Sequence, residues 1–477
     1  MEMRKIFSAI LTCGALMMSL SAREKPNVVF LLADDMNRDT WGIYGSKDCK
    51  TPNIDELAQD GLKFNKAYCS VAMCAPFRQE LYSGRSPWRT GTLANHSKSS
   101  AGTKSIPHYL KPLGYRVALM GKSHIGPREA YPFEMLKSGK GNEGFVATAT
   151  EFFDDCKIDN KAFCLFIASH DGHAPFTTGD PSQYDKDKLT IPPYWLDTPV
   201  LRENLVKYYA EITNFDKLVG QVRSVLEEKG LWENTIFAVC SEQGGQFPFA
   251  KWTCYDNGLH TGLVMSWPDV IEPGTETSSL ISTVDITPTF VDAAGGTLRE
   301  EDVDGKSFLK TLKGERQIIN EYFYGSFTNC NILNSKDRIY PIRVIRDSGF
   351  TLIYNPNHKN LTSNVTLSGV MRKRYDGDSS SKKDGGPATS WLELKDSSAK
   401  ANALIHKLNN RPEFELYNLN NDPYELTNEV DNPEYKNIIK TMKKALVAKL
   451  NDLGDSDPMA TEKALVKGRK SKKKKKE

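Results

Sequence analysis

Short runs of consecutive apolar residues recur along the first half of the chain and alternate with stretches of helical periodicity. The runs occupy residues 27–35, 115–122, 162–170 and 234–245. Unbroken apolar runs rich in β-branched and aromatic side chains are typical of strands that are buried on both faces. Between them, residues 51–62 and 201–229 have the spacing of amphipathic helices. This alternation predicts an α/β domain in which helices flank a large, mostly parallel β-sheet.

Each apolar run ends in polar side chains that can bind a metal ion or transfer a proton. These endings are Asp34 with Asp35, Lys122 with His124, His170 with His173, and Glu242 with Gln243. Any one of them could be an ordinary polar loop or a helix cap. Because open α/β sheets bind their ligands at the carboxyl ends of the strands, the four together predict a functional site at that edge.

After residue 320 the pattern changes to short segments in which apolar and polar residues alternate, for example at residues 341–354. A helix is expected at residues 433–453, where proline suits the first helical position. We therefore expect a larger domain at residues 23–320. A smaller α+β domain, built on an antiparallel sheet, should follow at residues 321–455.

The two ends of the chain differ from the domains between them. Residues 1–22 contain a basic start, the apolar run 6–20 and small residues near Ala22, which is typical of a signal peptide. This run is too short to span a bilayer comfortably and no later run is apolar enough, so we expect a periplasmic or secreted protein without a membrane span. Residues 456–477 are expected to be a disordered, lysine-rich tail, and solvation of its charges is favoured over nucleic-acid binding.

Cysteine usage and the donor atoms at the strand ends narrow the chemistry. Without the signal peptide the chain has eight cysteines, an even number that permits disulfides. They show neither C-x-x-C spacing nor a cluster with histidine, which argues against zinc. The acid and amide pairs offer only oxygen atoms, which favour calcium or magnesium.

One cysteine, Cys74, stands two residues before Pro76 and four before Arg78, in the segment "CAPFRQELYSGR". This segment resembles the signature of the type I sulfatases, in the alkaline-phosphatase-like superfamily: Cys-x-Pro-x-Arg followed by a glycine–arginine pair. Further similar segments, among them "GKSHIG" and "VDITPTFVDAAGG", extend the resemblance from residue 27 to about residue 428. In that family the cysteine is oxidised during export to formylglycine, whose hydrate is a geminal diol. The resemblance therefore implies a formylglycine-generating maturation enzyme as a partner.

The resemblance also implies a role for each candidate residue. The matches to the family's metal ligands, for calcium or magnesium, are Asp34, Asp35, Glu242 and Gln243. The matches to its catalytic residues are Cys74, Arg78, Lys122, His124, His173 and Lys251. Arginine would orient the diol, the lysines would clamp the sulfate, and the histidines would act as base (His124) and as acid or hydrogen-bond donor (His173). Taken singly, each could be a solvated lysine, a satisfied histidine or a small buried cysteine.

Six residues, in three segments of the chain, depart from the family pattern. Glu242 and Gln243 stand where an aspartate and an asparagine or histidine are usual, so each side chain is longer than the one it replaces. Phe77 replaces a serine that is common after the proline. His260, Gly262 and Asp256 differ from "EGGxRxP"-like segments, and we expect them to shape the substrate pocket.

These observations predict an exported sulfatase that acts on sulfated carbohydrate, such as a glycosaminoglycan, a mucin or an algal glycan. One diol hydroxyl would attack sulfur, and the other would release the covalent sulfate as the aldehyde re-forms. Three alternatives stay open. The first is a sulfamidase, which cleaves N-sulfate from glucosamine, because the Phe-Pro run in "GGQFPFAKWTCYD" is similar to that branch. The second is a phosphate or phosphonate monoester hydrolase, which the same metal site could serve. The third is a degenerate sulfatase that binds carbohydrate without turnover.

Overall fold

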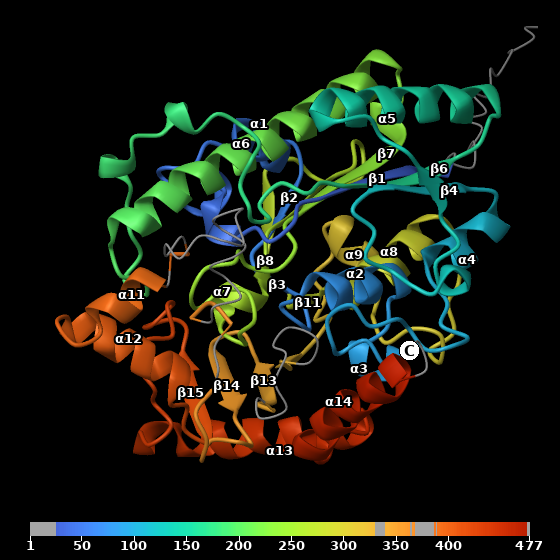
Figure 1. The fold of residues 1–477 in the computed structure, drawn as a ribbon. Helices are drawn as coiled ribbons and strands as arrows, with labels where there is room; N and C mark the ends of the chain where they lie inside the picture. Colours follow the sequence, from blue (N-terminus) through green and yellow to red (C-terminus); the bar gives the residue numbers. More distant parts are fainter. Residues whose placement is uncertain (1–24, 330–338, 363–364, 368–385, 388, 475–477) are drawn as a thin grey trace, which may run out of the picture.

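The centre of the protein is an eight-stranded sheet (Figure 1), seen in a computed structural model that describes residues 25–329, 339–362, 365–367, 386–387 and 389–474. Across the sheet the strands are β10 (Thr275–Thr277), β2 (Leu62–Phe64), β9 (Leu263–Ser266), β7 (Thr235–Cys240), β1 (Asn27–Leu32), β6 (Phe163–Ala168), β4 (Arg116–Gly121) and β5 (Glu134–Leu136). Strands β7, β1, β6, β4 and β5 are parallel, whereas β9 is antiparallel to β7 and β2. All residues of β1, β6 and β7 are buried. The predicted large, mostly parallel sheet is confirmed.

Helices cover both faces of this sheet. One face carries α1 (Pro52–Gln59), α5 (Gly141–Ile158) and α6 (Pro199–Glu228), and the other carries α2 (Cys74–Ser83), α4 (Ile106–Leu110) and α8 (Ile286–Ala293), as Figure 1 shows. Shorter elements of this domain are α3 (Pro87–Thr90), α7 (Asp256–Leu259), α9 (Leu309–Leu312), and a small sheet of β11 (Ile281–Ser282), β3 (Ala67–Tyr68) and β8 (His260–Thr261). The longest helix, α6, begins at Pro199, and the side chain of Thr198 caps it by accepting a hydrogen bond from the backbone N–H of Leu201.

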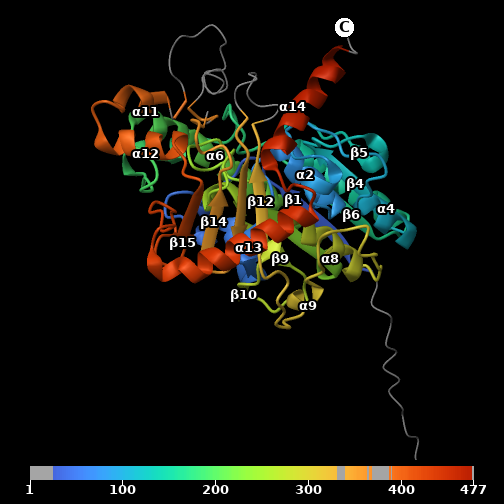
Figure 2. The same ribbon diagram turned by 90° about the horizontal axis from the view of Figure 1, so that it is seen from below.

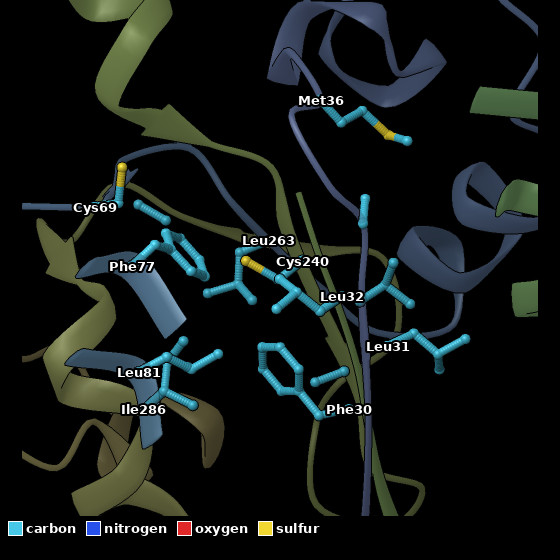
Figure 3. Close-up of a cluster of buried hydrophobic side chains, with 14 of the residues drawn as sticks. Phe30, Leu31, Leu32, Met36, Cys69, Phe77, Leu81, Cys240, Leu263 and Ile286 are labelled. Atoms are coloured by element: carbon cyan, nitrogen blue, oxygen red, sulfur yellow. The ribbon is translucent and has the colours of Figure 1, made fainter. Parts of the chain in front are cut away.

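Helix α2 is buried along its whole length, which is unusual for a helix of this size. Phe77 and Leu81 point from α2 toward Phe30, Cys240 and Leu263 of the sheet (Figure 3). This packing explains the phenylalanine after Pro76: it is a core residue with no exposed surface. The helix is thereby held with its first residue, Cys74, near the edge of the sheet where β1 and β7 end.

A smaller sheet follows in the second part of the chain. Its strands are antiparallel, in the order β12 (Phe323–Phe327), β13 (Ile342–Arg346), β14 (Phe350–Tyr354) and β15 (Phe414–Asn418). Helix α13 (Lys436–Asp452) lies against it (Figure 2), while α11 (Thr389–Leu394) and α12 (Ala399–Asn409) pack together at one end. A separate apolar cluster, which includes Leu352, Met442 and Leu446, joins α13 to the sheet. The predicted α+β architecture and its late helix are confirmed.

The last segment differs from the expectation of a disordered tail. Residues Pro458–Lys474 form helix α14, and the carboxylate of Glu462, which is buried, accepts a hydrogen bond from the backbone N–H of Asn329. Leu465 also packs against the main core. The expectation of disorder from residue 456 rested on charge, and it missed these anchors at the start of the segment.

Two other expectations bear on the chain ends and the cysteines. The predicted signal peptide, residues 1–22, lies outside the described residues. Within the described ranges no helix is long and apolar enough to cross a membrane. The seven cysteines of those ranges are free, and all seven are buried.

Candidate active site

Four neighbouring strands of the large sheet end at the same level. Leu32 of β1 pairs with Ala168 of β6 and with Cys240 of β7, and Ala168 pairs in turn with Gly121 of β4. The polar residues that follow these strands therefore meet at one edge. As predicted, the structure brings together the endings that carry Asp34, Lys122, His173 and Glu242, while His170 is exposed.

Three carboxylates form the centre of this edge. Asp34, Asp35 and Glu242 are fully buried, and each offers one oxygen that lies within 4.8 Å of the others. The amide of Gln243 donates to Asp35 and, at 3.1 Å, to Glu242, while its own buried oxygen has no hydrogen-bond partner in the described structure. Because a buried oxygen without a partner is costly, this donor set suits a hard divalent cation such as calcium or magnesium.

Three cationic side chains face the carboxylates. Lys122 pairs with Asp34, and Lys251 pairs with Asp35. The Arg78 guanidinium reaches Glu242 with Nε at 2.7 Å from Oε1, and its Nη1 donates to the backbone oxygen of Lys122 at 2.7 Å. All of these groups are buried, so their charges interact with little screening by water.

These pairings shift the protonation equilibria of the acids in opposite directions. Burial alone would raise the pKa of Asp34, but the charges of Lys122 and Arg78 hold that pKa well below its usual range. For Glu242, burial raises the pKa to about 8, although Arg78 opposes this effect. Two carboxylates in one buried cluster thus differ in proton affinity, as expected for like charges that compete for the same cations.

Cys74 lies beside the acids as the first residue of α2. Its Sγ is 3.3 Å from Nδ1 of His124 and 3.9 Å from Oδ1 of Asn95. Burial raises the pKa of the Cys74 thiol, so the unmodified side chain is a poor thiolate nucleophile. Burial, reinforced by Lys122 and Arg78, lowers the pKa of His124 to about 3. The imidazole is therefore neutral at pH 7, although so low a pKa also makes it a weaker base than a free histidine.

His173 approaches the cluster from the loop after β6. Its Nδ1 donates to the backbone oxygen of Ala174 at 2.7 Å, so Nε2 faces inward, 3.6 Å from Oδ2 of Asp35. The loop is tied to α6 by Glu211, whose carboxylate accepts from the backbone N–H groups of Gly172 and Thr177 at 2.9 and 2.6 Å. Burial lowers the pKa of His173, while the charge of Asp35 opposes that shift.

Backbone strain marks the same region. Asp35, His96, His124, Phe249 and Trp252 all have positive φ angles, between 48° and 65°. Side chains other than glycine rarely adopt this conformation, and such strain persists where the surrounding structure enforces it. All five residues lie in or directly beside the segments that supply the charged cluster.

Some residues of the site escaped the sequence analysis. Gln246 donates to Asp35 at 2.5 Å, and its place three residues after Gln243 was a usable signal. Asn95 and His96 come from a loop that no pattern singled out, although the His96 ring lies 5.3 Å from that of His124. His260 does not belong to this cluster: its Nδ1 lies 3.0 Å from Oδ2 of Asp256, and both residues line a neighbouring cavity. That they shape the substrate pocket stays a prediction.

Comparisons with known proteins agree with this geometry. The family model Sulfatase matches residues 26–296, and that of the N-sulphoglucosamine sulphohydrolase C-terminal region matches residues 244–362. An ulvan-active sulfatase of Formosa agariphila is 33% identical, over 92% of this chain and 82% of its own. Human N-sulphoglucosamine sulphohydrolase is 26% identical, over 91% and 92% of the two chains. A solved structure in complex with its substrate D-glucosamine-2-N,6-O-disulfate superposes with a TM-score of 0.66 at 18% identity, over 91% of this chain and 99% of that chain.

A mostly parallel sheet that gathers buried acids, lysines and histidines at one edge is the fold that the chain shares with this solved structure. The sequence matches identify the family, which lies within the alkaline-phosphatase-like superfamily. The chain belongs to the sulfatase family, and it is a sulfuric ester hydrolase.

Proposed function

We propose that this enzyme removes sulfate from carbohydrates and uses a formylglycine made from Cys74. The observation that carries the proposal is the place of Cys74, whose Sγ lies 3.3 Å from His124 at the start of the helix that also sends Arg78 to the acids. A carbohydrate substrate is supported by one relative named for its action on ulvan and by a structural neighbour solved with a disulfated glucosamine.

Two groups would complete the site. Formylglycine at position 74 would supply, as its hydrate, an oxygen nucleophile and the second hydroxyl that a serine lacks. Calcium or magnesium, held by Asp34, Asp35, Glu242 and Gln243, would polarise a sulfate oxygen and lower the pKa of the diol.

The side chains around position 74 would manage charge and protons. Lys122 and Lys251 place positive charge beside the sulfate in a water-poor site, where it stabilises the transition state strongly. His124 is neutral and can take a proton from the group at position 74. We assign His173 to the leaving oxygen, because its Nε2 faces the acid cluster, 3.6 Å from Oδ2 of Asp35.

Peptide mass spectrometry tests the maturation step. The tryptic peptide of residues 67–78 contains both Cys69 and Cys74, so it carries its own control. In protein made together with a maturation enzyme, formylglycine is expected at position 74 and an unchanged cysteine at position 69. An unmodified Cys74, beside a control sulfatase that is converted, would contradict the proposed nucleophile.

A second candidate function is hydrolysis of N-sulfate. The match of residues 244–362 to the sulphoglucosamine sulphohydrolase C-terminal model and the similar human enzyme favour it. Initial rates on O-sulfated and N-sulfated glucosamine distinguish O-sulfate from N-sulfate hydrolysis. A phosphonate monoester in the same assay tests the remaining alternative, a phosphate or phosphonate monoester hydrolase. The preferred proposal requires the O-sulfate to be hydrolysed fastest.

We also propose that the enzyme is exported. The support is the basic and apolar composition of residues 1–22. The intact mass of the protein recovered outside the cytoplasm should correspond to a chain that begins after Ala22.

A further inference from the structure

A second cavity, of about 670 Å³, lies between the large domain and the loops of the small sheet. Its walls come from the loops after β1 and β2, from the segment before α6, and from the turn after β15. None of the ten residues proposed for the reaction centre lines it. Phe249, two residues before Lys251, forms part of the wall, so the cavity is a neighbour of the reaction centre and not an extension of the acid cluster.

Aromatic rings form much of this wall. Tyr194 and Trp195 lie before α6, and Tyr424 comes from the small domain with its ring centroid 5.5 Å from that of Tyr194. Tyr194 is buried, whereas Tyr424 is 47% exposed, so Tyr424 is the ring of this pair that a ligand can reach. A rigid aromatic surface with polar groups around it suits a sugar ring, which has apolar faces and hydroxyl edges.

The acids of the cavity are already bonded within the protein. Asp39 accepts a hydrogen bond from the Tyr194 hydroxyl at 3.0 Å, and Asp48 accepts one from the backbone N–H of Thr190 at 2.7 Å. Asp256 and Glu425 both pair with Arg346. Asp39 and Asp48 thus receive hydrogen bonds from neutral donors, while the single charge of Arg346 is shared between Asp256 and Glu425.

Three cationic side chains also line the cavity: Arg38, Lys47 and Lys66. Arg38 stacks on Tyr44, 3.8 Å from the ring centroid, and its buried Nε has no hydrogen-bond partner among the described residues. Within the described residues, no carboxylate lies within ion-pair distance of Arg38, although its charge acts on nearby Asp39. Lys47 is exposed, and Lys66 donates to the backbone oxygen of Ser348 at 2.6 Å. An anionic group is the natural partner for such a set.

We propose that this cavity is a second carbohydrate-binding site that holds a sugar ring bearing a sulfate or carboxylate group. The ring stacks on Tyr424, and the anion pairs with Arg38. The cavity holds one unit of an oligosaccharide while another unit reacts, a biological role that rests on the proposed function. Binding itself does not depend on turnover.

Calorimetry on the full-length Cys74→Ala protein tests the site. The probes are a sulfated glucosamine–glucuronate tetrasaccharide, the same compound after desulfation, and neutral maltotetraose. Arg38→Gln should weaken binding of the sulfated probe roughly tenfold, because a hydrogen-bonded charge pair is lost. Tyr424→Ala should weaken it about fivefold through lost stacking. The matched controls Arg299→Gln and Tyr322→Ala lie outside this cavity and should leave binding unchanged.

Each outcome decides a separate point. Retained affinity for the desulfated probe identifies the carboxylate as the bound anion, whereas its loss identifies the sulfate. Affinity that neither Arg38→Gln nor Tyr424→Ala reduces overturns the inference. If Arg38→Gln does not fold, the exposed Tyr424 carries the test alone. Turnover of 4-nitrophenyl sulfate by the variants with Cys74 intact should match the parent; if the parent itself turns over no sulfate ester, the proposed function fails while the binding result still stands.

Discussion

Glu242 and Gln243 show how longer side chains can serve the same cluster. The Glu242 carboxylate reaches both Arg78 and the backbone N–H of Asp35, and the Gln243 amide bonds Asp35 and Glu242. The extra methylene of each side chain therefore lets it reach these partners from the end of β7. Shortening either residue should withdraw an oxygen from the proposed metal site.

Replacement of Gln243 by Asn tests directly whether the longer side chain is needed to bind the metal. Gln243→Asn should weaken calcium binding roughly tenfold, because calcium affinity depends on the number of oxygen ligands that reach the ion. Calorimetric titration of chelator-treated protein measures the change, and Gln221→Asn, on an exposed position of α6, is the control. Equal or tighter binding by Gln243→Asn would show that the cluster does not need the longer amide.

Phe77 is a core residue as well as part of the cysteine motif. Phe77→Ser should lower the free energy of unfolding by about 4 kcal/mol, because it leaves a cavity and buries a hydroxyl against Leu81 and the sheet. Chemical denaturation followed by fluorescence gives the value. Met135→Ser, at a position that is 52% exposed, should change it little. A loss below 1 kcal/mol for Phe77→Ser would contradict the packing argument.

At the scale of elements, α6 positions several parts of the active site from one rigid body. Tyr208 accepts a hydrogen bond from the backbone N–H of Asn37 and donates to the backbone oxygen of Asp35. One turn later Glu211 ties the His173 loop, and Asp216 accepts from the backbone N–H groups at the start of α1. A helix of 30 residues thus fixes the loops after β1 and β6 together.

Glu211 is therefore expected to be a positioning residue. Glu211→Ala should lower kcat roughly 10- to 100-fold, because displacement of His173 by a fraction of an ångström costs reactivity. The kcat of Glu211→Gln, which keeps one acceptor oxygen, should lie between that of the parent and that of Glu211→Ala. Calcium affinity should be unchanged in both variants. A parallel loss of calcium binding or of cooperative unfolding would indicate a general structural defect instead.

At the scale of the whole molecule, buried carboxylates join segments that are distant in the sequence. Glu80 accepts hydrogen bonds from Ser70 and Thr283, and Asp285 accepts from the backbone N–H of Lys306. Burial raises the pKa of Glu80 to about 7 and that of Asp285 to about 6. Glu462, on α14, is raised by burial to a pKa of about 7.

These raised pKa values give a contribution to stability that falls as pH rises, whereas the lowered pKa values of His124 and His173 give one that rises with pH. An acid whose pKa is higher in the folded protein binds more protons there than in the unfolded chain between the two pKa values. Its contribution is complete below about pH 4.5 and is lost as pH rises through about 7. Denaturation midpoints at pH 5 to 8 measure the slope. Glu80→Gln should remove the Glu80 contribution, so that the variant loses less stability than the parent between pH 5 and pH 7. An unchanged slope would contradict the protonated state of Glu80.

Local patterns alone determined much of this protein. Apolar runs predicted the strands because a strand buried on both faces has no polar alternation, and the four polar endings were predictable because parallel strands present their carboxyl ends at one edge. The Cys74 motif was recognised by its resemblance to the sulfatase signature, which is a contiguous segment of sequence. The late helix after Pro433 followed from its own periodicity.

Only the tertiary structure decided which distant groups meet. The pairing of Lys122 with Asp34 and of Lys251 with Asp35 joins segments that are 88 and 216 residues apart, and Asn95 reaches Cys74 from a loop without a pattern. The anchoring of α14 and the cavity between the domains arise in the same way. Periodicity reflects the neighbours of a residue along the chain, whereas these contacts depend on how the two sheets and their helices pack, and that packing alone sets them.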